Sequence, residues 1–292
     1  MPLSYGIAPP GYRLPDATRV GPVRLQIADL QRSIDYYERV LGLRVASREE
    51  GHAVLTSQFD DRPLVELSEK RGISPAPRRG AYGLYHFAIL LPSRADLGRF
   101  IAHIASLGIR LGAADHWVSE AIYLTDPDGL GIEVYADRPR EDWQVRGREL
   151  AMSTDPLDVE SVVNAAMGVP WTGAPSQTTI GHVHLHVGDL EKAEAFYHAA
   201  LGFDKIVWGY PGALFLSAGG YHHHLGTNTW SPGPSATDDQ AHLLEWQLEL
   251  PDAASARAAA DSLKSRGYSV EPSGDDWRTS DPWGTRVAIT SW

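Results

Sequence analysis

The 292-residue sequence contains no cysteine, no long run of apolar residues and fewer basic than acidic side chains. Without cysteine, disulfide bonds, thiolate metal sites and cysteine nucleophiles are all excluded. No apolar run approaches the ~20 residues that a membrane-spanning helix needs, and the first residues lack the basic and apolar regions of a signal peptide. We therefore expect a cytoplasmic protein that does not contact a membrane.

The charge of the chain narrows the choice of partners. Lysine and arginine together number 26 against 37 aspartates and glutamates, which gives a net charge of -11 with neutral histidines. Such a chain is poorly suited to the phosphate backbone of a nucleic acid. Apolar residues make up 43%, as in soluble globular proteins, and the length allows two domains. The unusual features are twelve histidines, several of them clustered, and nine tryptophans.

One segment, residues 180–202, organises the rest of the sequence. It reads IGHVHLHVGDLEKAEAFYHAALG. Histidines alternate with apolar residues from His182 onward, which predicts a strand with three imidazoles on one face. Asp189 is a suitable N-cap for the amphipathic helix that follows, and Gly202 is a suitable end for it.

The same pattern occurs earlier in the chain. Residues 23–42 match residues 183–202 without a gap, at an offset of 160 positions (183 minus 23). A match of this length indicates internal duplication. Two further segments resemble each other and each would begin another unit. They are LYHFAILLPS at residue 84 and LLEWQLELPD at residue 243. We therefore predict an α+β fold of four βαβββ units in two pairs.

The units suggest a division of the chain into domains. We expect an N-terminal domain over residues 1–138, a connecting segment over 139–178 and a C-terminal domain over 179–292, each domain holding two units. The last strands of the third unit are expected near residues 213–217 and 221–226. The second of these strands would carry His222, His223 and His224.

With this four-unit plan and the motif GGYHHHLGTNTW at residues 219–230, the chain resembles the vicinal oxygen chelate superfamily. Glyoxalase I, fosfomycin resistance proteins, bleomycin-binding proteins and extradiol catechol dioxygenases belong to it, and the chain looks closest to bacterial catechol-2,3-dioxygenase-like proteins. The resemblance extends from residue 23 to residue 289. It implies that paired units curve into a cup-shaped mixed sheet, with metal ligands on the first and last strand of each unit.

The resemblance implies a ligand set for the C-terminal domain. Its first-strand positions are His182 and Glu245. Its last-strand positions are His224, aligned over Glu66 by assuming a turn shorter by two residues, and Ala288, which cannot bind. The predicted metal ligands are therefore His182, His224 and Glu245. The choice among His222, His223 and His224 stays open, because a strand allows slips in register.

The N-terminal domain has a different set in the same four positions. Pro22 has no donor, and the others are Glu66, His86 and Glu133. Under the resemblance these three form a glyoxalase-like divalent site without its first ligand. This domain either binds a metal or only supports the fold.

Two imidazoles and one carboxylate leave the remaining positions of an octahedral ion open. This is the arrangement of non-haem Fe(II) oxygenases, in which a catecholate and dioxygen bind side by side. Fe(II) is the expected cofactor, with Mn(II) and Zn(II) as alternatives, although Zn(II) performs no redox step. His184 and Tyr221 are the candidates for proton transfer near the metal. Alternatively, they only satisfy polar groups at the mouth of the cup.

Three functions follow from these patterns. The first is an Fe(II)-dependent extradiol dioxygenase that cleaves a small aromatic diol with dioxygen. The second is a glyoxalase-type isomerase or lyase centred on Glu66, His86 and Glu133. The third is a metal-free binding protein of the bleomycin resistance type. The sequence leaves the oligomeric state open, with a homo-oligomer as one expectation.

Overall fold

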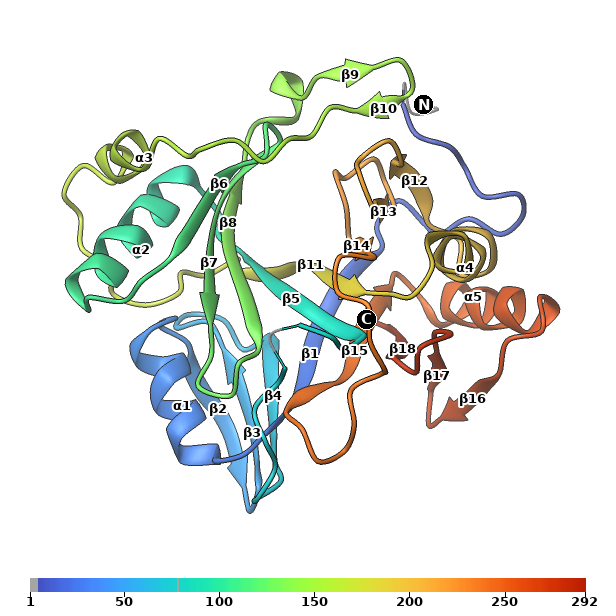
Figure 1. The fold of residues 1–292 in the computed structure, drawn as a ribbon, viewed down its shortest axis with the longest axis horizontal. Coiled ribbons are helices and arrows are strands. Elements are labelled where there is room, and N and C mark those ends of the chain that lie inside the picture. Colours follow the sequence, from blue (N-terminus) through green and yellow to red (C-terminus); the bar gives the residue numbers. More distant parts are fainter. Residues whose placement is uncertain (1–4, 78) are drawn as a thin grey trace.

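The computed structural model describes residues 5–77 and 79–292, and four βαβββ units follow one another in it (Figure 1). The first two units consist of these elements: β1 Arg19–Ile27, α1 Leu30–Arg39, β2 Arg44–Glu49, β3 His52–Thr56 and β4 Pro63–Glu69, then β5 Gly83–Leu90, α2 Arg94–Ser106, β6 Gly112–Asp115, β7 Ser119–Thr125 and β8 Gly131–Asp137. The repeat in the sequence thus predicted the units correctly.

The remaining elements complete the plan. A connecting segment carries η1 Arg140–Asp142, β9 Val145–Arg146, β10 Glu149–Leu150 and α3 Val159–Ala165. The last two units consist of β11 Thr179–His186, α4 Leu190–Ala193, η2 Glu194–Ala200, β12 Asp204–Val207, β13 Ala213–Ser217 and β14 Leu225–Asn228, then β15 His242–Leu250, α5 Ala253–Ser265, β16 Val270–Ser273, β17 Asp276–Ser280 and β18 Arg286–Ser291. None of the helices in the described ranges is long and apolar enough to cross a membrane.

Each unit turns from its first strand into its helix at a side-chain cap. The cap oxygen accepts a hydrogen bond from the backbone amide three residues further on, at Asp29, Ser93, Asp189 and Asp252. Such a cap stabilises a helix by about 1 kcal/mol. The third helix changes to π-type turns from Glu194 onward, and its end is closed by a bond from the Leu201 amide to the Phe196 carbonyl.

The strands form two eight-stranded mixed sheets. Sheet A has the order β12-β13-β14-β11-β5-β8-β7-β6, and sheet B has the order β16-β17-β18-β15-β1-β4-β3-β2. In sheet A the second unit joins the third through the antiparallel pair β5 and β11, and in sheet B the first unit joins the fourth through β1 and β15. The predicted α+β class with curved mixed sheets is confirmed.

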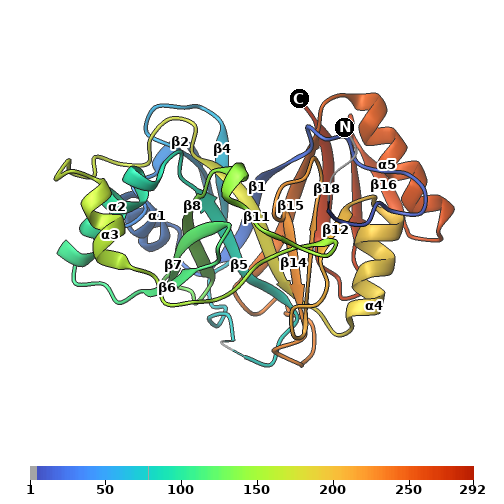
Figure 2. The ribbon, with the colours of Figure 1, turned by 90° about the horizontal axis from the view of Figure 1, so that it is seen from above.

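The pairing of the units differs from the prediction. We expected the first unit to join the second and the third to join the fourth. Helices α1 and α2 lie in one half of the molecule and helices α4 and α5 in the other, but both sheets cross from one half to the other (Figure 2). The first strand of every unit has a similar apolar pattern and a free edge until the units join, so sequence alone does not specify which edges pair.

One continuous core lies between the helices and the apolar faces of both sheets. Its largest fully buried side chains include Phe87 of β5, Tyr197 of η2 and Trp246 of β15. On β11, Val183 and Leu185 belong to this core, while the alternating His182 and His184 face the other way. Sheet A therefore presents a row of histidines on the face that the core leaves open.

The end of the third unit also differs from the sequence expectation. Gly219 and Gly220 form a turn, the segment from Tyr221 to His224 that follows is irregular, and β14 begins only at Leu225. Gly219 and Gly220 both have positive φ, at 59° and 66°, a conformation that favours glycine and breaks the strand. The three consecutive histidines therefore do not alternate across a sheet as a strand would require.

Candidate metal centre and active-site cavity

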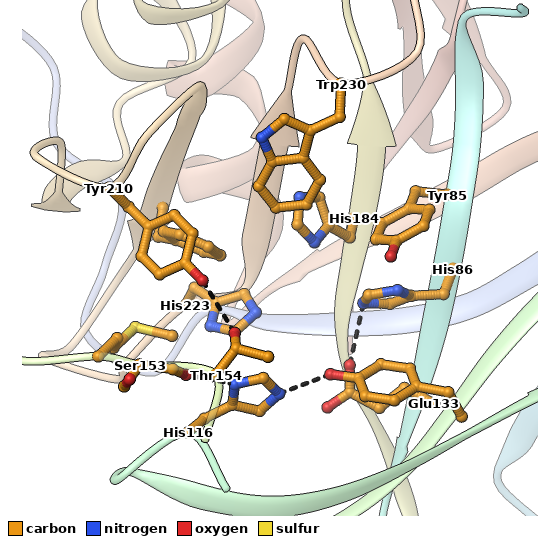
Figure 3. Close-up of a pocket in the computed structure, with 13 residues that line it drawn as sticks. Tyr85, His86, His116, Glu133, Ser153, Thr154, His184, Tyr210, His223 and Trp230 are labelled. Carbon is orange, nitrogen blue, oxygen red and sulfur yellow. Dashed lines mark hydrogen bonds and ion pairs between the residues drawn. The ribbon is translucent and has the colours of Figure 1, made fainter. Parts of the chain in front are cut away.

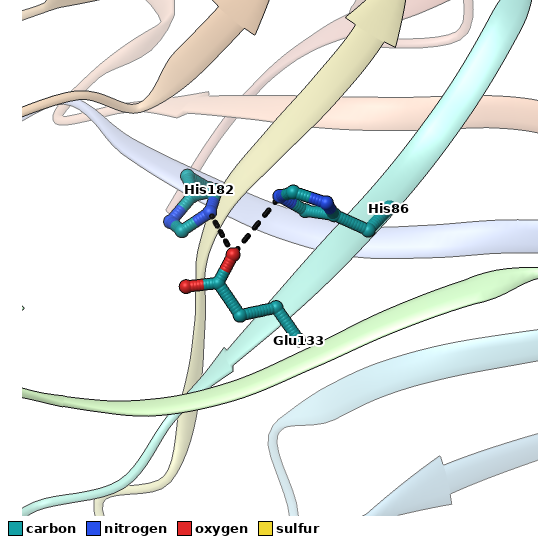
Figure 4. A group of neighbouring side chains, drawn as sticks. All are labelled: His86, Glu133 and His182. Atoms are coloured by element: carbon teal, nitrogen blue, oxygen red, sulfur yellow. Dashed lines mark hydrogen bonds and ion pairs between the residues drawn. The ribbon is translucent and has the colours of Figure 1, made fainter. Parts of the chain in front are cut away.

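Three neighbouring strands of sheet A bring His86, Glu133 and His182 together (Figure 4). The register explains their proximity. Ala88 of β5 lies opposite His182 on β11 and beside Glu133 on β8. His86 precedes Ala88 by two residues and so shares its face. The small side chain of Ala88, which is fully buried, leaves room between the imidazole and the carboxylate on its two sides.

The three donor atoms converge on one point. One carboxylate oxygen, Oε2 of Glu133, lies 3.0 Å from Nε2 of His86 and 3.2 Å from Nε2 of His182. One ligand atom from each residue lies within 4.8 Å of the others, and all three side chains are buried. Among the described residues, no lysine or arginine forms an ion pair with Glu133.

Electrostatics favour an anionic Glu133 beside a neutral His182. Burial raises the pKa of Glu133, but the charge and hydrogen bond of His182 and those of His86 outweigh burial and hold the pKa well below its ordinary value. Burial lowers the pKa of His182 to about 4, and the neighbouring carboxylate only partly opposes this shift. At neutral pH Glu133 is therefore ionised and His182 is neutral, the protonation state that a metal ion requires.

These donors fit a metal ion. A buried carboxylate without a cationic partner is costly, and a divalent ion at this point would compensate its charge. Two imidazoles and one carboxylate suit several first-row metals. The fourth position that the fold offers is Gly226, which lies beside His184 in the parallel pair of β11 and β14 and has no donor side chain. Three protein ligands would therefore leave the rest of the coordination sphere open.

A cavity of about 260 Å³ opens beside the triad (Figure 3). Its size lies near the lower end of the range for small-molecule sites. Aromatic side chains form much of the wall, and no lysine or arginine is among the described residues that line it. The residues that line it are Tyr85, His86, His116, Tyr123, Glu133, Met152, Ser153, Thr154, His184, Tyr210, Phe215, His223 and Trp230.

Tyr123 and His116 lie on one side of this cavity. Tyr123 of β7 is the antiparallel partner of Glu133 on β8. Its hydroxyl lies 2.5 Å from Nε2 of His116, whose Nδ1–H donates to the carbonyl of Ser153 at 2.7 Å. The hydroxyl of Tyr123 therefore donates to His116. Burial, reinforced by the charge of Glu133, raises the pKa of Tyr123 well above its ordinary value, so it stays protonated.

The two predicted proton-transfer residues have different surroundings. His184 lines the cavity, and its Nε2 accepts a hydrogen bond from the side-chain amide of Asn228 at 2.9 Å. The amide orientation is fixed because Oδ1 of Asn228 accepts from the backbone N–H of Trp230. Burial lowers the pKa of His184 well below its ordinary value, so it is neutral. Tyr221 does not line this cavity, and its hydroxyl contacts Asp137 and Tyr135 instead.

The structure brings only one of the three predicted metal ligands to the triad. His182 belongs to it. His224 lies in the irregular segment before β14, where its Nδ1 accepts from the amide of Ala218, and it lines a separate cavity. Glu245 lies on β15 in sheet B and receives a hydrogen bond from Arg278 at 2.8 Å. The set that we predicted as one site is therefore divided between sheet A and sheet B.

The second predicted set is also divided. His86 and Glu133 meet in the triad, whereas Glu66 lies on β4 in sheet B beside Arg24. The register also shows that no residues are missing in the alignment of the third unit. Arg24 pairs with Glu66 on the neighbouring strand, and His184 pairs with Gly226 in the same way. Each residue of the second pair lies 160 positions after its counterpart in the first pair. The turn shorter by two residues that we assumed for His224 is therefore wrong.

Three of the cavity residues that were not assigned from the sequence bear on the chemistry of the site. His223 was one of three alternatives in a histidine run that the glycine turn rearranges. Tyr123 could have been found once Glu133 was placed, since it lies opposite on the neighbouring strand. His116 has no local signal, because it lies between β6 and β7 and its contacts at the cavity wall are with Tyr123 and with Ser153 of the connecting segment.

The sequence matches the model of the Glyoxalase/Bleomycin resistance protein/Dioxygenase superfamily over residues 19–134 and 179–289. The chain therefore belongs to this superfamily, as the resemblance predicted.

Particular relatives narrow the comparison. A catechol-2,3-dioxygenase of Bacillus subtilis (strain 168) is 44% identical over 271 residues, which cover 91% of this chain and 94% of that protein. On this similarity the chain is an enzyme of the superfamily, related to its dioxygenases.

Two solved structures show the same fold. One, from Bacillus subtilis subsp. subtilis strain 168 and provisionally described as a dioxygenase, has a TM-score of 0.68 at 14% identity and covers 96% of this chain and 86% of its own. The other, glyoxalase I from Zea mays, has a TM-score of 0.57 at 19% identity and covers 94% and 92%.

Proposed function

We propose that the protein is a non-haem Fe(II) extradiol dioxygenase, which cleaves a catechol-type ring beside its two hydroxyls. The observation that carries this proposal is the triad of His86, Glu133 and His182 beside a small aromatic-lined cavity, with glycine at the fourth ligand position. The 44% identical catechol-2,3-dioxygenase supports the same chemistry. An isomerase that needs four protein ligands fits this centre less well.

When bound, iron would supply a Lewis acid that lowers the pKa of the catechol hydroxyls and a redox centre for dioxygen. His86, Glu133 and His182 would hold it. Their buried side chains on adjacent strands fix the three donor atoms, and His86 and Glu133 also line the cavity. Mn(II) and Zn(II) fit the same donors, but Zn(II) would support substrate binding alone.

The cavity residues divide the proton chemistry between them. In His184 the Nε2 lone pair is taken by Asn228, so only its Nδ1–H remains, and this group donates rather than accepts. His223 also lines the cavity, and no described residue forms a hydrogen bond with its Nε2. We assign His223 as the base that removes a proton from a substrate hydroxyl and His184 as a hydrogen-bond donor.

The aromatic wall would position the ring. Tyr85 and Trp230 lie with ring centroids 5.9 Å apart, and Tyr210 and Phe215 lie 5.7 Å apart, all in edge-on arrangements. Such surfaces bind a planar ring and exclude water from it. The part of the lining that the structure describes holds no lysine or arginine, which suits a diol without a carboxylate substituent.

Oxygen consumption tests the proposal directly. Protein purified without oxygen and loaded with Fe(II) should consume dioxygen with catechol and form a ring-opened coloured product. Zn(II)-loaded protein should bind catechol without consuming oxygen. If iron-loaded protein binds catechol but no simple catechol supports oxygen uptake, the dioxygenase assignment is wrong. A protein that retains no divalent metal at all would instead favour the metal-free binding function.

A further inference from the structure

A chain of hydrogen bonds runs from His223 at the cavity to a carboxylate outside it. Nδ1 of His223 lies 2.7 Å from Nδ1 of His222, and Nε2 of His222 lies 2.9 Å from Oδ1 of Asp137. Asp137 is the last residue of β8, which also carries Glu133. We propose that Asp137 and His222 are positioning residues, which fix the tautomer and orientation of His223 so that its Nε2 lone pair faces the substrate.

Counting the protons along the chain leads to this assignment. An ionised carboxylate only accepts hydrogen bonds. Oδ1 of Asp137 therefore accepts from the hydroxyl of Tyr221 at 3.2 Å and also from Nε2–H of His222. A neutral imidazole that donates from Nε2 accepts at Nδ1. The proton between the two rings then belongs to Nδ1 of His223. The other nitrogen of His223, Nε2, keeps its lone pair.

Packing holds both rings in place. His222 is fully buried and lies against Tyr221, Trp143 and Tyr135, with ring centroids 4.0, 5.4 and 6.0 Å away. The ring of His223 lies 4.0 Å from that of His182 and 5.0 Å from that of Phe215. A swing of either ring would displace these neighbours. The tautomer is therefore the degree of freedom that the hydrogen bonds determine.

The tautomer follows from the geometry alone, whereas its use in catalysis rests on the proposed function. The first measurement is therefore made on metal-free protein. In ¹⁵N-histidine-labelled wild type, long-range ¹H–¹⁵N correlation spectra at neutral pH should show the proton of His223 on Nδ1. A variant lacking His223 assigns the signal. In Asp137→Ala, the acceptor for His222 is lost, and the signal of His223 should shift to a mixture of both tautomers.

Two further variants separate positioning from general stability. The substitution Asp137→Asn keeps a side-chain oxygen that can accept from His222, so this variant should retain the wild-type tautomer. The control is Asp281→Ala. Asp281 also accepts a hydrogen bond from a tyrosine, Tyr197 at 2.9 Å, but this aspartate belongs to the fourth unit and is not part of the chain that ends at His223. It should lower the melting temperature without changing His223. If wild-type His223 carries its proton on Nε2, or if Asp137→Ala leaves the tautomer unchanged, the inference is overturned.

The second measurement uses iron-loaded protein. Asp137→Ala should lower kcat about 10- to 100-fold, the usual cost of losing a group that orients a functional histidine, while KM for catechol and iron content stay near wild type. Asp137→Asn should recover most of the loss. An equal change in iron content and kcat would show a structural role instead. Wild-type protein with the expected tautomer but no oxygen uptake would refute the dioxygenase assignment and leave the positioning result standing.

Discussion

Sheet A and sheet B are built on one plan but offer different chemistry on their open faces. In sheet A, His184 lies opposite His86, and at the corresponding place in sheet B Arg24 lies opposite Glu245. Ala88 pairs with Glu133 in sheet A. The corresponding pair in sheet B is Gln247 with Ala288. The two sheets share their apolar faces and differ in the side chains that point away from the core.

The partner of the carboxylate decides what each face can do. In sheet B, Glu245 is paired with the guanidinium of Arg278 at 2.8 Å, so a cation is already present. In sheet A, the ion-pair partners of Glu133 among the described residues are imidazoles, and the pKa of His182 is lowered so that this ring is neutral. The donor set of sheet A therefore suits a metal ion, whereas the carboxylate of sheet B already has a cationic partner. Duplication supplied the frame, and a few side chains on one face made the site.

Removing the carboxylate of sheet A should have the largest effect. Glu133→Gln replaces the only anionic ligand by a neutral amide, and we expect metal affinity to fall by more than the ~100-fold that outer groups contribute, with turnover lost. Metal analysis after dialysis and oxygen uptake measure both. The matched control is Glu245→Gln in sheet B, which should keep its iron and its activity. The reverse result would restore the predicted ligand set of His182, His224 and Glu245.

Features that depend on residues close together in the sequence could be predicted, and features that depend on distant residues could not. The capped helices and the repeated units are local, and residues 23–42 and 183–202 predicted them. The pairing of unit edges is not local, and placing His182 with Glu245 failed for that reason. The two glycines before Tyr221 caused a second error, because their positive φ values make a turn where alternation suggested a strand.

The cavity shows the same division. His182 and His184 were identified because alternation fixes their face. His86 and Glu133 were identified too, but in a set with the wrong third member, because their partner came from the third unit. His116 depends on the path of the connecting segment, for which no sequence rule applies. Residue types were therefore predictable, and their grouping required the sheet topology.

Two of the four histidines that line the cavity, His184 and His223, should differ in their effect on turnover. His223→Gln removes the proposed base, and general base catalysis typically contributes about 100- to 10,000-fold, so we expect kcat to fall by at least ~100-fold with iron retained. His184→Gln removes only a donor and should mainly raise KM. Steady-state kinetics with catechol on variants of matched iron content distinguish them. A larger loss of kcat in His184→Gln would reverse the two assignments.

Sheet A can also be made to resemble sheet B at one position. Ala88 lies between His182 and Glu133, where sheet B carries Gln247. Ala88→Gln should crowd the fully buried gap, and overpacking of this kind costs about 1–3 kcal/mol. We expect a lower melting temperature and weaker metal binding, whereas Ala88→Gly should keep the metal. Unchanged metal affinity in a folded Ala88→Gln protein would show that the gap is not needed.

The last prediction concerns the stability of the metal-free protein in acid. Burial lowers the pKa of His182 to about 4 from an ordinary value of 6.5. Between these values the unfolded chain binds the proton and the folded chain does not, so stability falls as the pH drops from 6.5 towards 4. At about 1.4 kcal/mol per pKa unit, the loss is on the order of 3 kcal/mol. The pKa of Glu133 is also lowered, so this group too makes the folded protein less stable as the pH falls below the ordinary pKa of a glutamate. Thermal unfolding at pH 7.5 and pH 5 should therefore show a smaller difference for His182→Gln than for wild type, while variants at Glu245 in sheet B keep the full difference. An equal loss in His182→Gln would place the acid sensitivity elsewhere, in the other buried histidines of sheet A.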